Sequence, residues 1–502
     1  FDFRRHAWFQ RLGAVGYTRV PVLVAAPPTG ALRLFRLRMA AAARLRAALP
    51  GDVGGFAAAV TSGDRSGVGQ ATLEALRASN LAHLLAISGL HMGLLAGFVF
   101  GAVRLALAAV PVLALRWPVR KLAALAAISA AAGYLALSGG NVATERAFVM
   151  TAVVLGAVIA DRRAFSLRAV ALAAMVVLAL RPESLLGPGF QMSFAATTAL
   201  IAVFGALRDH SIGLGPRWLA PGLGVGISSL VAGVATAPVA AAHFNTLAHF
   251  GLPANLLAVP VMGLVVIPAA VLAAVMAPFG LEMPAVQAMG LGLRWILAVA
   301  DWAAGLPGAR GYVPSPGPMV LPLFALGMLV VILWQGRARL AGLAPVAAAF
   351  LLWAGAERPP VLVAESGALV GVMTPPGRAL SKPRGAGFVA GIWLENDGDS
   401  APQTEAAARW PGGDGPLRRI EVGPRQIVHV PGKRAARALT GCTRAQVVVA
   451  PVPLALEGPC LVLDPPRLRG TGAVAFDADG RLRAARDPNR RRLWSGQVGP
   501  AQ

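Results

Sequence analysis

The sequence predicts an all-α polytopic membrane protein with about ten transmembrane helices and a small β-rich or mixed C-terminal extramembrane domain. Of its 502 residues, 56% are hydrophobic and only 14% are charged. The mean hydropathy is +0.63. Apolar stretches between residues 83 and 355 reach the roughly 20 residues that a helix needs to cross a bilayer. This composition favours one large membrane domain over several soluble ones.

The region before the first span is basic. Residues 31–50 predict a basic amphipathic helix that lies on the membrane surface and ends at Pro50. The net charge of the chain is +23, and residues 1–50 hold nine Arg against Asp2 alone. Such a concentration of positive charge attracts anionic lipid or nucleic acid. The alternative interpretation is an ordinary basic segment that flanks a first span. The sequence opens on Phe1 without a signal-peptide pattern, so we expect upstream sequence to be missing.

Ten apolar segments are predicted to span the membrane. Backbone amides in lipid must bond within their own segment, so each segment is expected to be a helix. The fourth and the last are short enough to be re-entrant instead. The segments cover 83–110, 121–138, 142–160, 168–181, 188–206, 218–243, 253–277, 285–303, 317–334 and 340–355.

Basic loops predict the orientation. Loops after odd-numbered spans are Arg-rich, whereas loops after even-numbered spans hold little beyond Arg181 and Arg310. The positive-inside rule then places the first set in the cytoplasm and both chain ends outside. This assignment depends on the span count. The basic residues are Arg116, Arg120, Lys121, Arg162, Arg163, Arg168, Arg208, Arg217, Arg337 and Arg339.

The first span carries polar groups where lipid would disfavour them. His83, Ser88 and His91 lie near its outer end. In a continuous helix Ser88 and His91 share a face, and His83 lies about 80° away from His91. The same span carries a helix-packing row with a four-residue repeat, along which another backbone can approach. The alternative is ordinary helix packing with hydrogen-bonded histidines. The row is Gly89, Gly93, Gly97 and Gly101.

Other spans also carry polar groups near their predicted outer ends. Glu145 and Arg146 enter the third span, Gln191 the fifth and Asn255 the seventh. Prolines 260 and 268 predict that the seventh helix is broken or kinked, which is tolerated where the freed backbone lines a cavity. Ordinary kinks with locally satisfied polar groups are the alternative. These groups are expected to lie at a similar depth near the outer side of the membrane, where together they would line a hydrated vestibule.

The tail, residues 356–502, has short β-branched runs separated by Gly and Pro turns, which predict a β-rich or mixed domain. Its Cys442 and Cys460 form a possible disulfide if the tail faces an oxidising compartment; otherwise they are free thiols. The chain has no phosphate-binding loop and no His-Glu-x-x-His motif, and His429 is the only histidine of the tail. We therefore predict no metal and no cofactor.

Several motifs resemble the ComEC-type competence proteins, in the order of that family. The longest match is Leu81-Ala-His-Leu-Leu-Ala-Ile-Ser-Gly-Leu-His-Met-Gly93, and together the matches cover about 52–335. The shorter matches are Gly63-Asp-Arg65, Phe190-Gln-Met-Ser-Phe194, Ala235-Thr-Ala-Pro238, His243-Phe-Asn245 and Ala254-Asn-Leu-Leu-Ala-Val-Pro260.

The resemblance implies an inner-membrane channel that passes single-stranded DNA into the cytoplasm during natural transformation. Together with the span count and the positive-inside orientation, it gives an expected domain order. Residues 1–30 would end an extracytoplasmic OB-type region, 52–335 would form the membrane competence domain, 336–355 the last span, and 356–502 an outward-facing domain. Many members carry a metallo-β-lactamase-like domain there, but its histidine-rich metal-binding motif is absent from this chain. The tail could thus be an eroded relic of that domain.

The resemblance implies passage rather than catalysis, so we do not expect an enzyme. The partners would be single-stranded DNA, membrane lipids and separate proteins acting as DNA receptor, nuclease and cytoplasmic motor. Channel-lining or gating roles are predicted for His83, Ser88, His91, Glu145, Arg146, Gln191 and Asn255. Two alternatives stay open: a secondary transporter or exporter of another substrate, and a membrane hydrolase using the first-span cluster.

Overall fold

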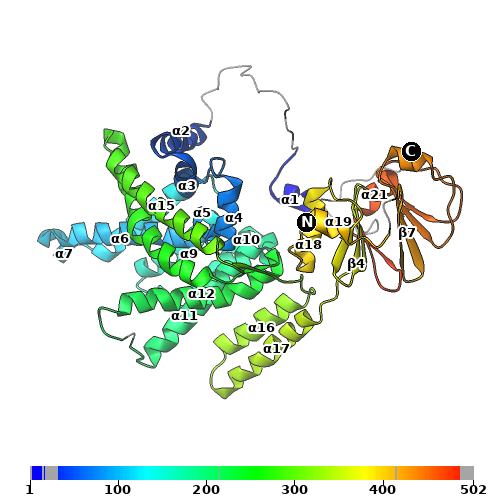
Figure 1. Ribbon diagram of the computed structural model, residues 1–502. Helices are drawn as coiled ribbons and strands as arrows, with labels where there is room; N and C mark the ends of the chain where they lie inside the picture. The colour runs from blue at the N-terminus through cyan, green and yellow to red at the C-terminus, as the bar shows by residue number, and fades with distance from the viewer. Residues whose placement is uncertain are drawn as a thin grey trace. The chain divides into compact units, whose positions relative to one another are not determined.

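A computed structural model describes residues 3–13, 16, 18, 32–213, 215–412, 415–486 and 494. The chain divides into two compact units (Figure 1). The larger unit comprises Leu23–Ala240 and Leu247–Gly311. The smaller unit comprises Phe1–Val22, Ala241–Thr246 and Tyr312–Gln502.

From α2 to β2 the chain is almost entirely helical. The elements are α2 (Arg33–Ala48), α3 (Gly51–Ser62), α4 (Gln70–Ala78), α5 (Ala82–Leu85), α6 (Gly89–Ala108), α7 (Pro111–Arg116), α8 (Val119–Leu137), α9 (Val142–Ile159), α10 (Leu167–Leu180), η1 (Pro182–Leu186), α11 (Pro188–Asp209), α12 (Ala220–Phe244), β1 (Thr246–Ala248), α13 (Gly251–Val261), η2 (Met262–Val266), α14 (Ile267–Met276), η3 (Ala277–Phe279), α15 (Met283–Ala304) and β2 (Arg310–Tyr312). Strands β1 and β2 pair in a small sheet.

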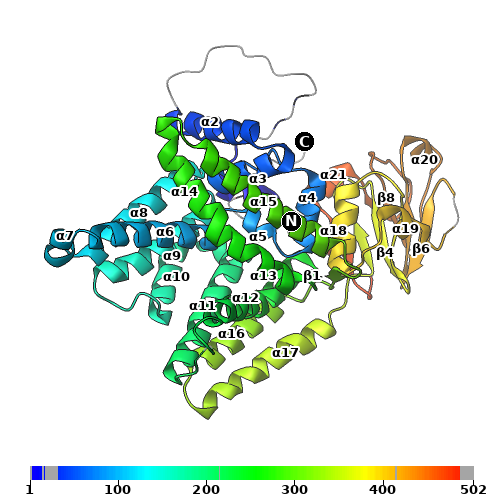
Figure 2. The same ribbon diagram turned by 60° about the vertical axis from the view of Figure 1, so that its left-hand side comes forward.

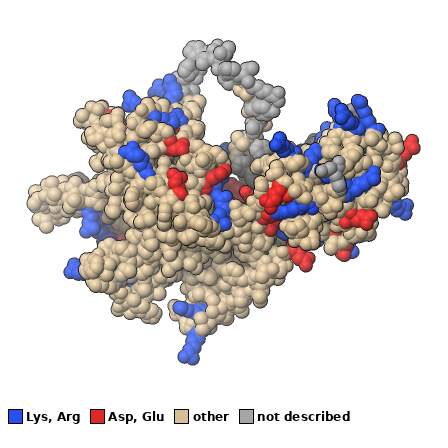
Figure 3. All heavy atoms as spheres, viewed as in Figure 1, with Lys and Arg blue, Asp and Glu red and all other residues tan. Residues whose placement is uncertain are grey.

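The predicted polytopic helical class is confirmed. Within the described residues, eight helices are long and apolar enough to cross a membrane, and α10 and α16 (Val320–Leu333) are shorter apolar helices. In Figure 3 the surface over α11 and α12 is nearly free of charged side chains, as lipid contact requires. The chain is therefore a multi-pass membrane protein.

The first predicted span, 83–110, is not one helix. Helix α5 ends at Leu85, Ala86 and Ser88 are extended, and α6 begins at Gly89. Serine is favoured at the position just before a helix, because its hydroxyl can hydrogen-bond to nearby backbone groups in place of helical hydrogen bonds. The angle predicted between His83 and His91 was therefore wrong, because the two residues do not share a helix.

The seventh predicted span contains an irregular turn near its prolines, although the helical backbone continues through it. Helix α13 passes into the π-helical turn η2, which is followed by α14 and the short turn η3. Pro260 and Pro268 have no amide hydrogen, so each removes one helical hydrogen bond. One proline precedes this turn and the other follows it. By contrast, Pro238 lies inside α12, which runs unbroken from Ala220 to Phe244.

The core of the larger unit lies between α3, α4, α5 and the α13–α15 segment. Glycine is required at Gly55, where a Cβ atom would lie 2.1 Å from the carbonyl oxygen of Gly67. Helix α2 is tied to the unit by Arg38, which donates to the Ser62 carbonyl at 2.6 Å, and by an Arg46–Asp64 ion pair of 2.7 Å. Its position on a membrane surface stays a prediction.

The smaller unit contains two helices followed by a mixed α/β domain, which confirms the predicted β-rich or mixed tail. Its elements are α1 (Phe3–Phe9), α16, η4 (Arg337–Gly342), α17 (Leu343–Ala354), β3 (Val361–Val363), β4 (Val370–Thr374), β5 (Gly377–Leu380), α18 (Gly387–Asp397), α19 (Gln403–Ala408), β6 (Arg418–Val422), β7 (Arg425–His429), α20 (Lys433–Arg437), β8 (Gln446–Val449), β9 (Leu461–Leu463), α21 (Pro465–Thr471), β10 (Val474–Phe476) and β11 (Leu482–Ala484). The predicted OB-type end at 1–30 falls largely outside the described residues.

Two sheets pack face to face in this domain (Figure 2). The first has the order β11-β10-β3-β4-β5 and is antiparallel throughout. The second has the order β6-β7-β8-β9, with parallel pairing from β7 to β9. Buried valines of both sheets form the shared core, as in other β-sandwiches. The sulfur atoms of Cys442 and Cys460 are bonded, just before β8 and β9.

His429 gives this domain a pH-dependent stability. Its ring is fully buried; Nε2 lies 3.2 Å from the Gly367 carbonyl oxygen, and Nδ1 has no partner in the described chain. Burial, with the charges of Lys382 and Arg418, lowers the pKa of His429 to about 4. In the unfolded chain the pKa is about 6.5. The stabilisation by the neutral ring is therefore complete above pH ~6.5 and is lost as the pH falls towards 4.

We expect the free energy of unfolding of this domain to fall by about 3 kcal/mol between pH 7 and pH 4 through His429 alone. Denaturant unfolding at a series of pH values, followed by protease susceptibility, measures this. His429→Gln should remove that part of the pH dependence. An unchanged slope in the variant would contradict the assignment.

Candidate functional site

Ser88 and His91 meet at the start of α6. Ser88 occupies the N-cap position, but its side chain does not cap the helix. Instead its hydroxyl shares a 3.0 Å hydrogen bond with Nδ1 of His91. The His91 ring is fully buried, and its Nε2 atom has no hydrogen-bond partner among the described residues. This predicted pair is therefore a real contact.

His83 and Asn255 are linked through Asn80, a residue that sequence reasoning missed. Nδ1 of His83 lies 2.9 Å from the Asn80 carbonyl oxygen. Asn80 has a φ of 60°, in the left-handed region that Asn tolerates better than most residues. Its side chain lies against Gly251, where an added Cβ would be 2.9 Å from the Asn80 Cβ. Asn255 in turn donates to the Gly251 carbonyl oxygen at 2.6 Å.

Glu145 pairs with Arg181, which had been counted only as a loop charge. The guanidinium donates to both carboxylate oxygens, at 2.6 and 2.9 Å. The two side chains are 35% and 32% exposed. Asn141 caps α9 by accepting from the amides of Ala143 and Thr144, so Glu145 lies in the first turn of α9. The bidentate pair joins the start of α9 to the end of α10.

Arg146 points towards the start of α11. Its Nη1 donates to the Val142 carbonyl at 3.3 Å, and its buried Nε has no partner in the described part of the chain. A Cβ added at Gly189 would lie 2.6 Å from its Nη2 atom. Gln191 donates to the Leu185 carbonyl at 3.1 Å. Glu145, Arg146 and Gln191 therefore meet where α9, η1 and α11 converge.

The predicted site residues form two groups. One group is His83, Ser88, His91 and Asn255; the other is Glu145, Arg146 and Gln191. Both adjoin one hydrophobic cluster, because Ile87 precedes Ser88, Ala147 follows Arg146, and both pack with Tyr134. The first group thus lies in α5, around the start of α6 and in α13, and the second lies at the starts of α9 and α11. Whether they line a water-filled path stays a prediction.

The glycine row of α6 was predicted to let another helix approach closely, and no helix of the described chain does so. A Cβ atom added at Gly89, Gly93, Gly97 or Gly101 would meet nothing within 4 Å. Helix α6 packs through other faces instead, for example through Ala96 against Ala124 and Ala127 of α8. The four-residue repeat places the glycines on one face, but no helix of the described chain approaches that face.

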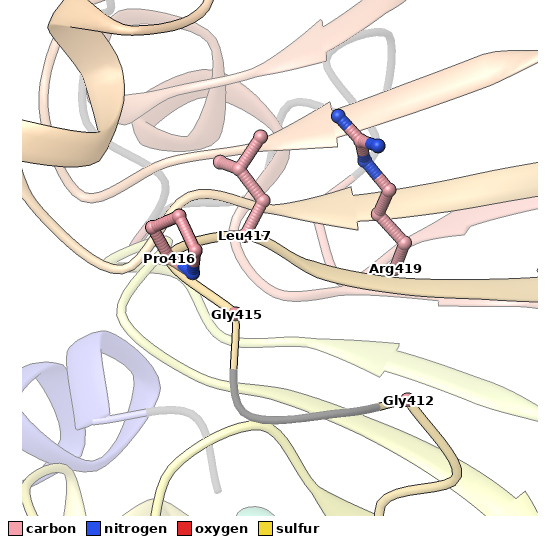
Figure 4. Close-up of a pocket in the computed structure, with 5 residues that line it drawn as sticks. All are labelled: Gly412, Gly415, Pro416, Leu417 and Arg419. Carbon is pink, nitrogen blue, oxygen red and sulfur yellow. The ribbon is translucent and has the colours of Figure 1, made fainter.

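No candidate metal centre accompanies these groups in the described part of the chain. Within the described residues, no cluster of three or more His, Cys, Asp or Glu could hold a metal ion. A surface depression of about 260 Å³ lies in the smaller unit beside β6, with Arg419 as its charged lining residue (Figure 4). It shares no residue with either group.

The Glu145–Arg181 pair should show measurable coupling. In a double-mutant cycle with Glu145→Ala and Arg181→Ala, we expect a coupling energy of about 1 kcal/mol, reduced by the partial exposure of both side chains. Thermal unfolding of the detergent-solubilised chain measures it. The Lys121–Asp161 pair, with side chains 41% and 72% exposed, is the matched control and should couple by less than about 0.5 kcal/mol. Equal coupling in both cycles would contradict a structural role for Glu145–Arg181.

Comparison with known proteins identifies the family. The family model described as "Competence protein" matches residues 60–338, more than half of the chain. "ComE operon protein 3" of Bacillus subtilis (strain 168) is 28% identical over 290 residues, which cover 57% of this chain and 35% of that protein. The chain therefore spans about a third of the length of this relative. No solved structure matches. The resemblance to the ComEC-type proteins is confirmed, and the chain belongs to the competence protein family.

Proposed function

We propose that this chain forms an inner-membrane channel that passes single-stranded DNA into the cytoplasm during natural transformation. The observation that carries the proposal is that the family match, 60–338, contains both groups of polar residues at the starts of α6 and α9. Single-stranded DNA needs a wet path with cationic and polar lining. A bundle without such a path would have little reason to hold these costly groups within apolar helices.

Each residue has a proposed role. The Arg146 guanidinium contacts phosphates near the mouth, and the Glu145–Arg181 pair fixes the helices around it. The polar groups His83, Ser88, Gln191 and Asn255 line or gate the path, and the buried His91 gates it by ordering the start of α6. Residues 52–335 form the competence domain, 336–355 the last span, and 356–502 an outward-facing domain. The bonded Cys442 and Cys460 support an oxidising compartment for that domain.

The proposed partners are single-stranded DNA, membrane lipids and three other proteins: a DNA receptor, a nuclease and a cytoplasmic motor. The chain carries no phosphate-binding loop, so the motor would be supplied separately. The proposed activity is passage of the strand and involves no catalytic step.

Deletion and complementation test the proposal. Deleting the gene in its transformable host should abolish transformation while DNA still binds at the cell surface, and the intact chain should restore it. His91→Ala should restore it at least about tenfold less well, because the variant removes a buried group that orders the start of α6. Immunoblotting of membranes checks that the variant accumulates. Unchanged transformation in the deletion strain would overturn the proposal.

A secondary transporter is the second candidate, because the π-helical turn η2 is an irregularity within a span, and irregular spans are common in transporters. Loss of transformation without loss of any solute flux would exclude it. A hydrolase built on Ser88 and His91 fits less well. Nε2 of His91 has no partner in the described chain, so no carboxylate there orients the ring. Ser88→Ala should therefore remove no hydrolytic activity.

A further inference from the structure

Helix α15 is the most extensively buried of the candidate spans within the described residues, with half of its apolar window enclosed. Its exposed positions form one stripe. Gln287, Arg294 and Asp301 recur every seven residues along it. At 100° per residue, seven residues return to within about 20° of the same direction, so the three side chains form a polar row. The row extends over about 21 Å, at 1.5 Å per residue.

An aromatic row runs beside the polar row. Trp295 and Trp302 are also seven residues apart, and each is 49% exposed. The indole nitrogen of Trp295 donates to the Leu257 carbonyl at 3.0 Å, which holds one edge of the ring against α13. A broad part of the ring stays uncovered. The rows together present a cation, two indole rings, an amide and a carboxylate on one face of a spanning helix, and the exposed Leu291 lies among them.

This face is unsuited to lipid. Arg294 lies at the centre of α15, about 15 Å from either end, which is farther than an arginine side chain reaches. A charged side chain facing lipid at that depth costs about 2.5–3.5 kcal/mol on insertion scales. Within the described chain, the side chains of Arg294 and Asp301 form no hydrogen bond or ion pair. The groups that solvate or neutralise these two charges therefore do not belong to the described residues.

We propose that this face, the α15 stripe of Gln287, Arg294, Trp295, Asp301 and Trp302, lines an aqueous path and contacts the passing DNA strand. The proposal rests on the proposed channel function and deepens it. The Arg294 guanidinium meets the phosphates, and the indole rings of Trp295 and Trp302 stack with bases regardless of sequence. Asp301 repels phosphate, which keeps the strand from being held tightly along the whole row and permits movement.

The first test is chemical accessibility in membranes that contain the full chain. Arg294→Cys should react with a water-soluble methanethiosulfonate at least about tenfold faster than Leu272→Cys, because thiolates form only where water reaches. Leu272 is the matched control: it is 48% exposed and lies in α14, within an apolar span. The bonded Cys442 and Cys460 should leave the parent chain unreactive. Equally slow reaction of both variants would overturn the proposal, because the stripe would then face lipid or another protein.

The second test separates a DNA contact from mere hydration. In cells producing Arg294→Cys, a reagent that attaches trimethylammonium should restore transformation, whereas one that attaches sulfonate should not. Arg294→Lys should retain activity. Trp295→Ala should lower transformation about tenfold and Trp295→Phe much less, because only stacking is conserved in the latter. Fast labelling with no dependence on the attached charge would overturn the DNA contact but leave the channel proposal standing. A deletion strain that transforms normally would overturn the channel itself, whatever the labelling shows.

Discussion

Replacing Asp397 with alanine should lower the free energy of unfolding of the C-terminal domain by about 3–5 kcal/mol. Asp397 is buried at the end of α18 and accepts hydrogen bonds from two arginines. Arg378 donates through Nε and also through Nη2 at 3.1 Å, and Arg358 donates at 2.9 Å. Arg378 is fully buried, so removal of the carboxylate leaves an uncompensated charge inside the domain.

Protease susceptibility of the full chain in detergent, measured against denaturant, tests this expectation. Glu405→Ala is the matched control in the same domain. Glu405 is exposed and pairs with Arg409 at 3.3 Å, so its loss should cost less than about 0.5 kcal/mol. Similar midpoints for the two variants would show that the buried network contributes no more than a surface pair.

Replacing Gly55 with alanine should prevent the larger unit from reaching its native packing. The added Cβ would lie 2.1 Å from the Gly67 carbonyl oxygen and 3.0 Å from the Val68 nitrogen. Both are backbone atoms, so no side-chain rotation relieves the clash, and the cost should reach or exceed about 3 kcal/mol. The loop that contains them follows Gly63-Asp-Arg65, at the start of the competence family match.

The amount of folded protein in membranes, measured by size-exclusion of the fluorescently tagged chain, tests the Gly55 expectation. Gly97→Ala is the matched control. Its added Cβ would meet nothing within 4 Å, and alanine favours a helix over glycine by about 1 kcal/mol. We expect an unchanged or increased yield of the Gly97 variant. A normal yield of Gly55→Ala would contradict the tight α3 contact.

The membrane class, the apolar helices and the irregular turn in the seventh span were predictable, because each depends on properties read along a short stretch of chain. Length and hydropathy determine which segments can cross a bilayer. Prolines 260 and 268 disturb helical bonding wherever they stand. The nearness of Ser88 and His91 was predictable from their three-residue spacing, although Ser88 precedes α6 in extended backbone instead of sharing the helix with His91. The break before Gly89 was missed because apolar residues continue through it.

The α15 stripe was also readable from the sequence, although it was overlooked. Gln287, Arg294 and Asp301 recur every seven residues within a predicted span. What the sequence could not show is that the opposite face of the helix is buried, with Leu293 and Ile296 in the core. Whether the polar side chains of α15 are exposed or are hydrogen-bonded to other residues depends on how the helix packs against its neighbours.

The sequence by itself determined the class of this protein, its family, and which side chains are costly in a membrane. The tertiary structure decided which partners those side chains have. Glu145 meets Arg181 across 36 positions, and Asn80 joins His83 to the start of α13. The glycine row of α6 has the spacing for helix packing, yet Cβ atoms added along it would meet no atom of the described chain within 4 Å. Spacing fixes the face on which a residue lies, whereas the element that covers that face depends on contacts between distant segments, which no local pattern encodes.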